Sequence, residues 1–184
     1  MDYYQDIRVL ADAETAEHVV MAQLFQRLHQ YLQRAADGRI GISFPEVKLT
    51  LGNRLRLHGS QEDLSSLQQC DWQHGLKDYI HCDVIARVPE NKSWRTVRRV
   101  QVKSSAERLR RRSVKKGWLS ESEAQQQINA INEQRSDLPF LFIKSGSNGN
   151  AYPFFIEHGP IGPVPVPGEF SSYGLSATTP IPWF

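Results

Sequence analysis

The sequence predicts an α+β protein built from two parts, residues 1–90 and residues 91–184. Three observations indicate this class: short alternating segments and helix-period segments follow one another up to Val88, a polar break occupies 89–92, and a strongly basic strand and helix come next. Hydrophobic residues make up 40% of the 184 residues and aromatic residues 10%, which is enough for a core. We therefore expect a folded protein and not a disordered tail.

The first part is expected to contain four strands and two helices. Pro45 and Pro89 end two of the strands, Leu55 and Leu57 show strand alternation, and Ser60 with Asp63 resembles a capping box. Leucines and valines spaced by one helical turn mark the buried side of the long helix: Val20, Leu24, Leu28 and Leu32. The predicted strands are Tyr3–Leu10, Ile40–Phe44, Arg54–His58 and Tyr79–Val88, and the predicted helices run from Ala13 to about Arg34 and from Ser60 to Gln69.

This β-α-β-β-α-β order is the ferredoxin-like arrangement. Many RNA-binding modules share it, but a fold does not by itself give a function. The aromatic signature of proteins that stack RNA bases on the sheet is absent, so the sheet is not predicted to be a base-stacking platform.

The second part is expected to begin with a strand and a basic helix. Alternation predicts a strand over Thr96–Lys103, Ser104 with Glu107 caps a helix over about 105–116, and Gly117 ends it. Ser120 and Glu123 repeat the capping spacing before a polar helix. A hairpin over Leu138–Lys144 and Tyr152–Glu157, joined by SGSNGN, and a non-helical tail PIGPVPVPGEF complete the chain, whose last aromatic residues are expected to pack back onto the domain.

Positive charge is concentrated in residues 95–116. This segment has ten Arg or Lys residues against one acid and so carries +9, whereas the whole chain carries +2 and the remainder −7. Arg108, Arg111, Arg112 and Lys115 share one helix face, where guanidinium groups repel one another unless anions lie between them. A solvated basic face is the simpler interpretation, but the density favours binding of a nucleic acid.

The composition also limits the class of protein. No apolar run approaches the length of a membrane span, and the N-terminus lacks the apolar core of a signal peptide. Cys70 and Cys82 have no metal-ligand spacing and do not indicate a disulfide framework, so neither a metal nor another cofactor is expected. A reducing cytoplasm is the expected location.

An RNA-binding protein can cleave its ligand with few groups, because the 2′-hydroxyl of RNA is itself a nucleophile. Cleavage needs a base near that hydroxyl, groups that hold the ribose in line, and donors to the phosphate. The six histidines are candidates for the base, although a lone histidine usually has only a structural or surface role. His29 is favoured because it follows Leu28 at the edge of the buried stripe, where its ring can be held while its tip stays exposed.

Several strings then identify a family. MDYYQDIRV, LFQRLHQYL, GRIGISFP, LRLHGS, RRVQVKSSAERLRRR, LSESEA, FIEHGP, FSSYGLS and the terminal PWF occur in this order. Over nearly the whole chain the sequence resembles the subtype I-F CRISPR-associated endoribonuclease that processes repeat RNA. The arginine-rich block together with the YGLS segment is the most specific part of this resemblance.

The resemblance implies metal-independent cleavage at the 3′ base of a repeat stem-loop, which leaves a 2′,3′-cyclic phosphate. It implies that His29 takes the 2′-hydroxyl proton, that Ser145 holds the ribose, and that Ser147 and Tyr173 are neighbouring active-site residues. Arg99 and Gln101 match residues that read base edges low in the stem. The full set of implied RNA-binding residues is Arg99, Gln101, Lys103, Arg108, Arg110, Arg111, Arg112, Lys115, Lys116 and Tyr152.

The implied partners are the repeat RNA and the other subunits of the surveillance complex, and the enzyme is implied to stay bound to its RNA product after cleavage. The free protein is expected to be a monomer. Tyr152 stands where the family has a phenylalanine that stacks under the closing base pair, and Lys115 and Lys116 replace arginines. No general acid is assigned. Ser145 and Ser147 taken alone would be ordinary loop serines, and a non-catalytic hairpin-binding subunit is the alternative function.

Overall fold

The computed structural model forms two compact units, one made of Met1–Arg99 with Pro139–Phe184 and the other of Val100–Leu138. The predicted boundary near residue 90 lies inside the first unit, between its two sheets, and the division of the chain into an N-terminal and an RNA-binding domain stays a prediction. The structure describes residues 1–184 except 11–14, 36, 102–105, 127–137, 146–148 and 163–164, and the side chains of 35 and 106–109.

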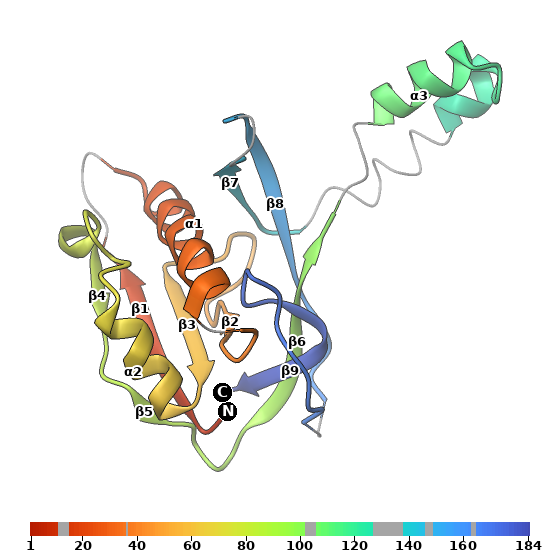
Figure 1. Ribbon diagram of the computed structural model, residues 1–184. Coiled ribbons are helices and arrows are strands. Elements are labelled where there is room, and N and C mark those ends of the chain that lie inside the picture. Colours follow the sequence, from red (N-terminus) through yellow and green to blue (C-terminus); the bar gives the residue numbers. More distant parts are fainter. Residues whose placement is uncertain (11–14, 36, 102–105, 127–137, 146–148, 163–164) are drawn as a thin grey trace. The chain divides into compact units, whose positions relative to one another are not determined.

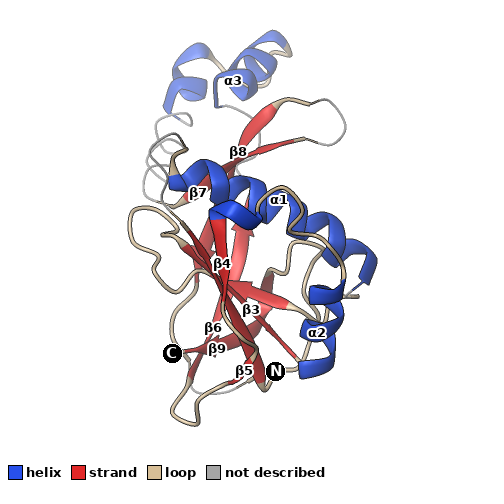
Figure 2. Cartoon of the chain, turned by 90° about the vertical axis from the view of Figure 1, so that its left-hand side faces the viewer, coloured by secondary structure: helices blue, strands red, loops and turns tan. Residues whose placement is uncertain are grey.

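The first sheet has the strand order β2-β3-β1-β4, with a fifth strand, β5, also pairing with β1. Helices α1 (Glu17–Ala35) and α2 (Gln61–Gln69) lie on the same face of this sheet (Figures 1 and 2). The order and the antiparallel pairings confirm the α+β class and the ferredoxin-like arrangement of the first part. The strands are β1 (Tyr3–Val9), β2 (Gly41–Ser43), β3 (Arg54–Gly59), β4 (Ile80–Cys82) and β5 (Ala86–Arg87).

Helix α1 supplies most of the helical side of the core. The predicted stripe is buried as expected, and Phe25 and Met21 extend it. The helix begins at Glu17, later than the predicted start at Ala13, part of which lies outside the described residues. The predicted cap of α2 is confirmed, because the Ser60 hydroxyl accepts a hydrogen bond from the Asp63 backbone N–H at 3.0 Å.

The single fourth strand predicted over Tyr79–Val88 is wrong in its continuity. Two short strands pair with β1, and residues 83–85 between them belong to neither strand, with Val84 82% exposed. The Asp83 backbone N–H donates to the Asp6 carbonyl, and the Gln5 side chain donates to the Asp83 carbonyl. These two bonds fix the backbone of Asp83 against β1 at the point where the strand is interrupted. The alternating apolar pattern of the sequence does not reveal this interruption.

The second sheet has the order β7-β8-β6-β9, with β6 (Ser93–Val100), β7 (Phe140–Lys144), β8 (Ala151–His158) and β9 (Ser176–Trp183). Strands β7 and β8 form the predicted hairpin. Strand β9 is not among the strands predicted from the sequence. Its Pro180 and Pro182 are unfavourable in a central strand, and they fit here because β9 is an edge strand. The predicted return of the terminal aromatic residues is thereby confirmed, since Trp183 pairs with Ser93 of β6.

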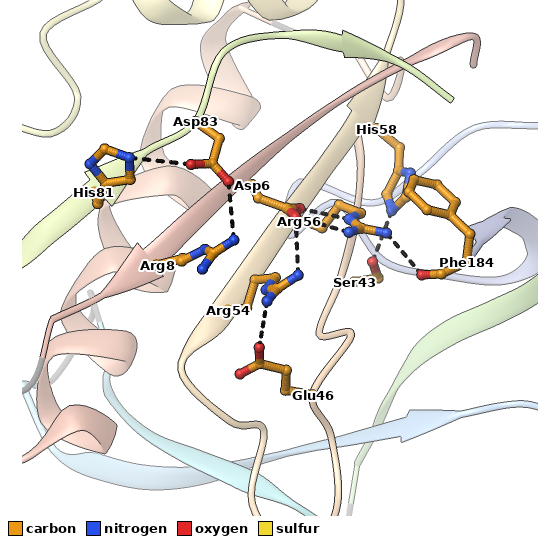
Figure 3. Close-up of polar contacts among 10 residues, drawn as sticks. All are labelled: Asp6, Arg8, Ser43, Glu46, Arg54, Arg56, His58, His81, Asp83 and Phe184. Carbon is orange, nitrogen blue, oxygen red and sulfur yellow. Dashed lines mark hydrogen bonds and ion pairs between the residues drawn. The ribbon is translucent and has the colours of Figure 1, made fainter. Parts of the chain in front are cut away.

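A buried ion pair connects the first sheet with the end of the chain (Figure 3). Arg56 on β3 donates to both carboxylate oxygens of Asp6 on β1, at 2.6 and 2.9 Å, and to the Phe184 main-chain oxygen at 3.1 Å. The Arg56 guanidinium also lies 4.0 Å from the centroid of the Phe184 ring. A charge that is paired, hydrogen-bonded and stacked in this way is tolerated in the interior.

The second unit contains helix α3 (Ala106–Lys115) and a further helical segment at 121–126. The predicted stop at Gly117 is confirmed: its φ is 68°, and the Trp118 N–H donates back to the Ser113 carbonyl. Ser120 and Glu123 form the predicted capping box, whereas Ser104 lies outside the described residues. No helix in the described part of the chain has the length and apolarity needed to cross a membrane.

Candidate active site

The ring of His29 is held on one side by an aromatic ring and on its edge by a backbone oxygen. His29 lies on α1, one residue beyond the buried Leu28, and is itself half-buried. Its ring stacks on the Tyr173 ring with centroids 3.7 Å apart and planes 8° from parallel. Its Nδ1 lies 2.8 Å from the Ser172 carbonyl oxygen.

This contact determines the tautomer of the neutral imidazole. A carbonyl oxygen only accepts, so Nδ1 must carry the proton and donate it to Ser172. The lone pair of the neutral ring is then on Nε2. An oriented imidazole with a free Nε2 is the arrangement that a general base requires.

Tyr173 belongs to an aromatic cluster that also receives Arg99. The rings of Tyr173 and Phe154 lie 4.8 Å apart, and the Arg99 guanidinium lies 4.5 Å from the Phe154 centroid and 5.7 Å from that of Tyr173. Tyr152, also beneath Arg99, is hydrogen-bonded to Tyr173. Burial raises the pKa of the Tyr173 hydroxyl, the Tyr152 contact acts in the same direction and Arg99 opposes both, so the hydroxyl stays protonated at neutral pH.

Ser145 directly follows strand β7, at the start of the loop that joins it to β8. Its backbone is fixed at both ends, because the Ser145 N–H donates to the Asn150 carbonyl and the Gly149 N–H donates to the Ser145 carbonyl, each at 2.9 Å. Ser147 lies outside the described residues.

The other histidines have different surroundings. His58 is fully buried with Nε2 2.8 Å from the Ser43 hydroxyl, and burial, with Arg56 as the next cause, holds its pKa well below the usual range (Figure 3). His158 packs edge-on against Phe44 and Trp183, and its pKa is lowered to about 4 by burial. His18, His74 and His81 are exposed. His158 is half-buried like His29, but both of its ring nitrogens are enclosed, whereas the His29 ring is hydrogen-bonded through Nδ1 alone among the described contacts.

The predicted RNA-binding residues fall into separate groups. Arg99 and Tyr152 lie in the first unit with His29, whereas Gln101, exposed just after β6, and the cations of α3 lie in the second. Lys103 and the side chain of Arg108 lie outside the described residues. Arg111, Arg112, Lys115 and Lys116 are exposed, with the Lys116 ammonium 4.6 Å from the Trp118 centroid. Arg110 is less exposed than these and forms an ion pair with Glu121.

Sequence reasoning missed two features of this site. The stack of Arg99 over three rings depends on residues from β6, β8 and the segment before β9, and no local pattern indicates it. Gln26 bonds the backbone of Lys144, but a glutamine on an otherwise polar helix face carries no recognisable signal.

The fold and the site therefore define an α+β protein that has an oriented histidine in one unit and a strongly basic helix in the other. Residues 4–184 match the family described as CRISPR-associated protein (Cas_Csy4), and the chain belongs to this family. It is 53% identical over 184 residues to the "CRISPR-associated endonuclease Cas6/Csy4" of Escherichia coli (strain UTI89 / UPEC), with all of both chains covered. It is 42% identical over 187 residues to the protein of the same name from Pseudomonas aeruginosa (strain UCBPP-PA14), again over the full length of both. The resemblance read from the sequence motifs is confirmed.

Proposed function

We propose that this chain is a metal-independent endoribonuclease that binds the stem-loop of a CRISPR repeat and cleaves it at the 3′ base of the stem. The observation that carries the proposal is the oriented ring of His29, with Nδ1 bonded to the Ser172 carbonyl and the lone pair of the neutral ring therefore on Nε2. Membership of the family and the names of the two relatives support an endonuclease that acts in CRISPR RNA processing.

In the proposed reaction His29 Nε2 removes the proton from the 2′-hydroxyl of the nucleotide before the cut. The resulting oxygen attacks the adjacent phosphorus in line, and the bond to the 5′-oxygen of the next nucleotide breaks. The products are a 2′,3′-cyclic phosphate and a 5′-hydroxyl. Ser145 holds the ribose, Ser147 is a further proposed active-site residue, and protonated Tyr173 supports the His29 ring by stacking. The group that protonates the leaving oxygen is not assigned.

Binding is proposed to combine base reading with charge neutralisation. Arg99 and Gln101 read base edges low in the stem, and Tyr152 stacks under the closing base pair. The narrow major groove of A-form RNA excludes most side chains, but in a short hairpin it opens towards the loop, where α3 can enter. Affinity should therefore fall steeply with salt. The implied phosphate ligands are Lys103, Arg108, Arg110, Arg111, Arg112, Lys115 and Lys116.

After cleavage the protein is proposed to stay on its product and join the other subunits of the CRISPR complex in the cytoplasm. The alternative is a subunit that only binds the hairpin. Such a subunit would use the basic helix but would have no need of an oriented histidine.

The deciding experiment is cleavage of the repeat RNA from the genome that encodes the protein, in excess EDTA, beside a substrate with a 2′-deoxy nucleotide just before the cut. Cutting of the all-ribose RNA alone, with both RNAs bound, supports the proposal. Inhibition by EDTA would mean that a metal takes part. Tight binding of both RNAs without cleavage would identify the binding subunit instead.

A further inference from the structure

Gln26 connects the helix that carries His29 with the strand that leads to Ser145. It lies on α1, one turn before His29, and its amide forms two hydrogen bonds with the backbone of Lys144, the last residue of β7. Nε2 donates to the Lys144 carbonyl at 3.2 Å, and the Lys144 N–H donates to Oε1 at 3.3 Å. A single side chain thus pairs with both backbone groups of one residue.

These two bonds take the place of a neighbouring strand. Strand β7 stands at the end of the order β7-β8-β6-β9, so one of its edges has no strand beside it in the part of the chain that the structure describes. In an antiparallel pair, two opposed residues exchange an N–H and a carbonyl in the same double pattern. The primary amide of Gln26 reproduces that pattern from a helix.

The two bonds also restrict a movement that apolar packing allows. Leu141 and Ile143 of β7 share the core with Phe25 and Leu28 of α1. Burial of such side chains is non-directional, so it sets the distance between helix and strand but only weakly opposes sliding of one along the other. A hydrogen bond to a backbone group does oppose sliding, because its strength depends on distance and angle.

The link lies where sliding would change the candidate site. Residues three apart on a helix are neighbours on its surface, so Gln26 and His29 move together. On the other side, Ser145 is the next residue after Lys144, and its backbone is fixed to Asn150 and Gly149. Gln26 therefore joins the group proposed as the base to the loop proposed to hold the ribose.

We infer that Gln26 is a positioning residue for cleavage, which sets the register of the Ser145 loop against the His29 helix. The inference rests on the proposed function. Displacement of reacting groups by about 1 Å costs up to about 100-fold in rate, so loss of the link should slow the chemical step. RNA affinity should not change, because Gln26 is assigned no contact with RNA.

The test compares Gln26→Met, which is similar in length but forms neither bond, with Gln23→Met and Gln30→Met at two exposed positions of the same helix. Single-turnover cleavage of the repeat hairpin is measured with saturating protein, and Kd with the 2′-deoxy hairpin. Gln26→Met should lower the saturated rate by about 10- to 100-fold with an unchanged Kd. Both control variants should match the unaltered protein.

A second measurement is independent of cleavage. Hydrogen exchange at the Lys144 amide should become faster in Gln26→Met and not in the controls, because this N–H loses its acceptor. Faster exchange with an unchanged cleavage rate would overturn the inference, as would a rate loss explained entirely by weaker binding. If the unaltered protein bound the all-ribose hairpin without cutting it, the proposed function would fail and the inference with it.

Discussion

Lowering the pH from about 7.5 to about 5 is expected to destabilise this protein through a histidine that takes no part in the proposed chemistry. His158 ends strand β8, packed against Phe44 and Trp183, and neither of its buried ring nitrogens has a hydrogen-bond partner among the described residues. Burial, with Arg95 as the second cause, lowers the pKa of His158 to about 4 from the model-peptide value of 6.5. The folded state therefore keeps this ring neutral.

The sign and size of the effect follow from linkage. Below pH 6.5 the unfolded chain takes up a proton at His158 that the folded chain does not, so the free energy of unfolding falls as the pH falls towards 4. With these two pKa values, His158 removes about 2 kcal/mol between pH 7.5 and pH 5, and about 3 kcal/mol once the pH is below both. The depressed pKa of His58 adds a loss of the same sign.

The assay is urea unfolding followed by tryptophan fluorescence at the two pH values, for the unaltered chain and for His158→Leu. Leucine fits the apolar surroundings and cannot titrate, so the variant should lose about 2 kcal/mol less between the two pH values. The matched control is His18→Gln, which replaces an exposed histidine and should keep the full dependence. An equal pH dependence in His158→Leu and the unaltered chain would refute the reasoning.

Three further predictions concern the proposed site and the buried ion pair. His29→Ala should abolish hairpin cleavage and leave the Kd for the 2′-deoxy hairpin near its original value; cleavage at the native rate would exclude His29 as the base. Arg99→Ala should cost about 1–3 kcal/mol of binding and relax selectivity at one stem position, whereas equal weakening on every hairpin would indicate a phosphate contact. Asp6→Ala should lower the free energy of unfolding by about 3–5 kcal/mol because Arg56 loses its carboxylate. A loss no larger than that of the exposed control Asp71→Ala would show that this ion pair does not stabilise the fold.

Features that depend on nearby residues could be predicted from the sequence. The stripe of α1, the caps at Ser60 and Ser120 and the stop at Gly117 each depend on residues at most a few positions apart. The same is true of the β7–β8 hairpin, whose strands are joined by a short turn-forming loop. Local spacing therefore indicated most elements of both sheets.

Features that depend on distant pairing could not be predicted. The interruption between β4 and β5 depends on hydrogen bonds with Gln5 and Asp6 of β1. The two prolines of β9 disfavour a strand unless it is known to lie at the edge of the sheet beside β6. Both arise because tertiary contacts override local propensity.

The candidate site shows the same division. The sequence by itself predicted His29 at the edge of a buried stripe, concentrated the positive charge in residues 95–116, and carried the motifs of the family. Only the tertiary structure decided which histidine has an oriented ring, because the oxygen that fixes its tautomer belongs to Ser172, 143 residues along the chain. It also buried His58, enclosed the ring nitrogens of His158, and brought Arg99, Tyr152 and Tyr173 together. Such contacts come from segments that meet only when the chain folds.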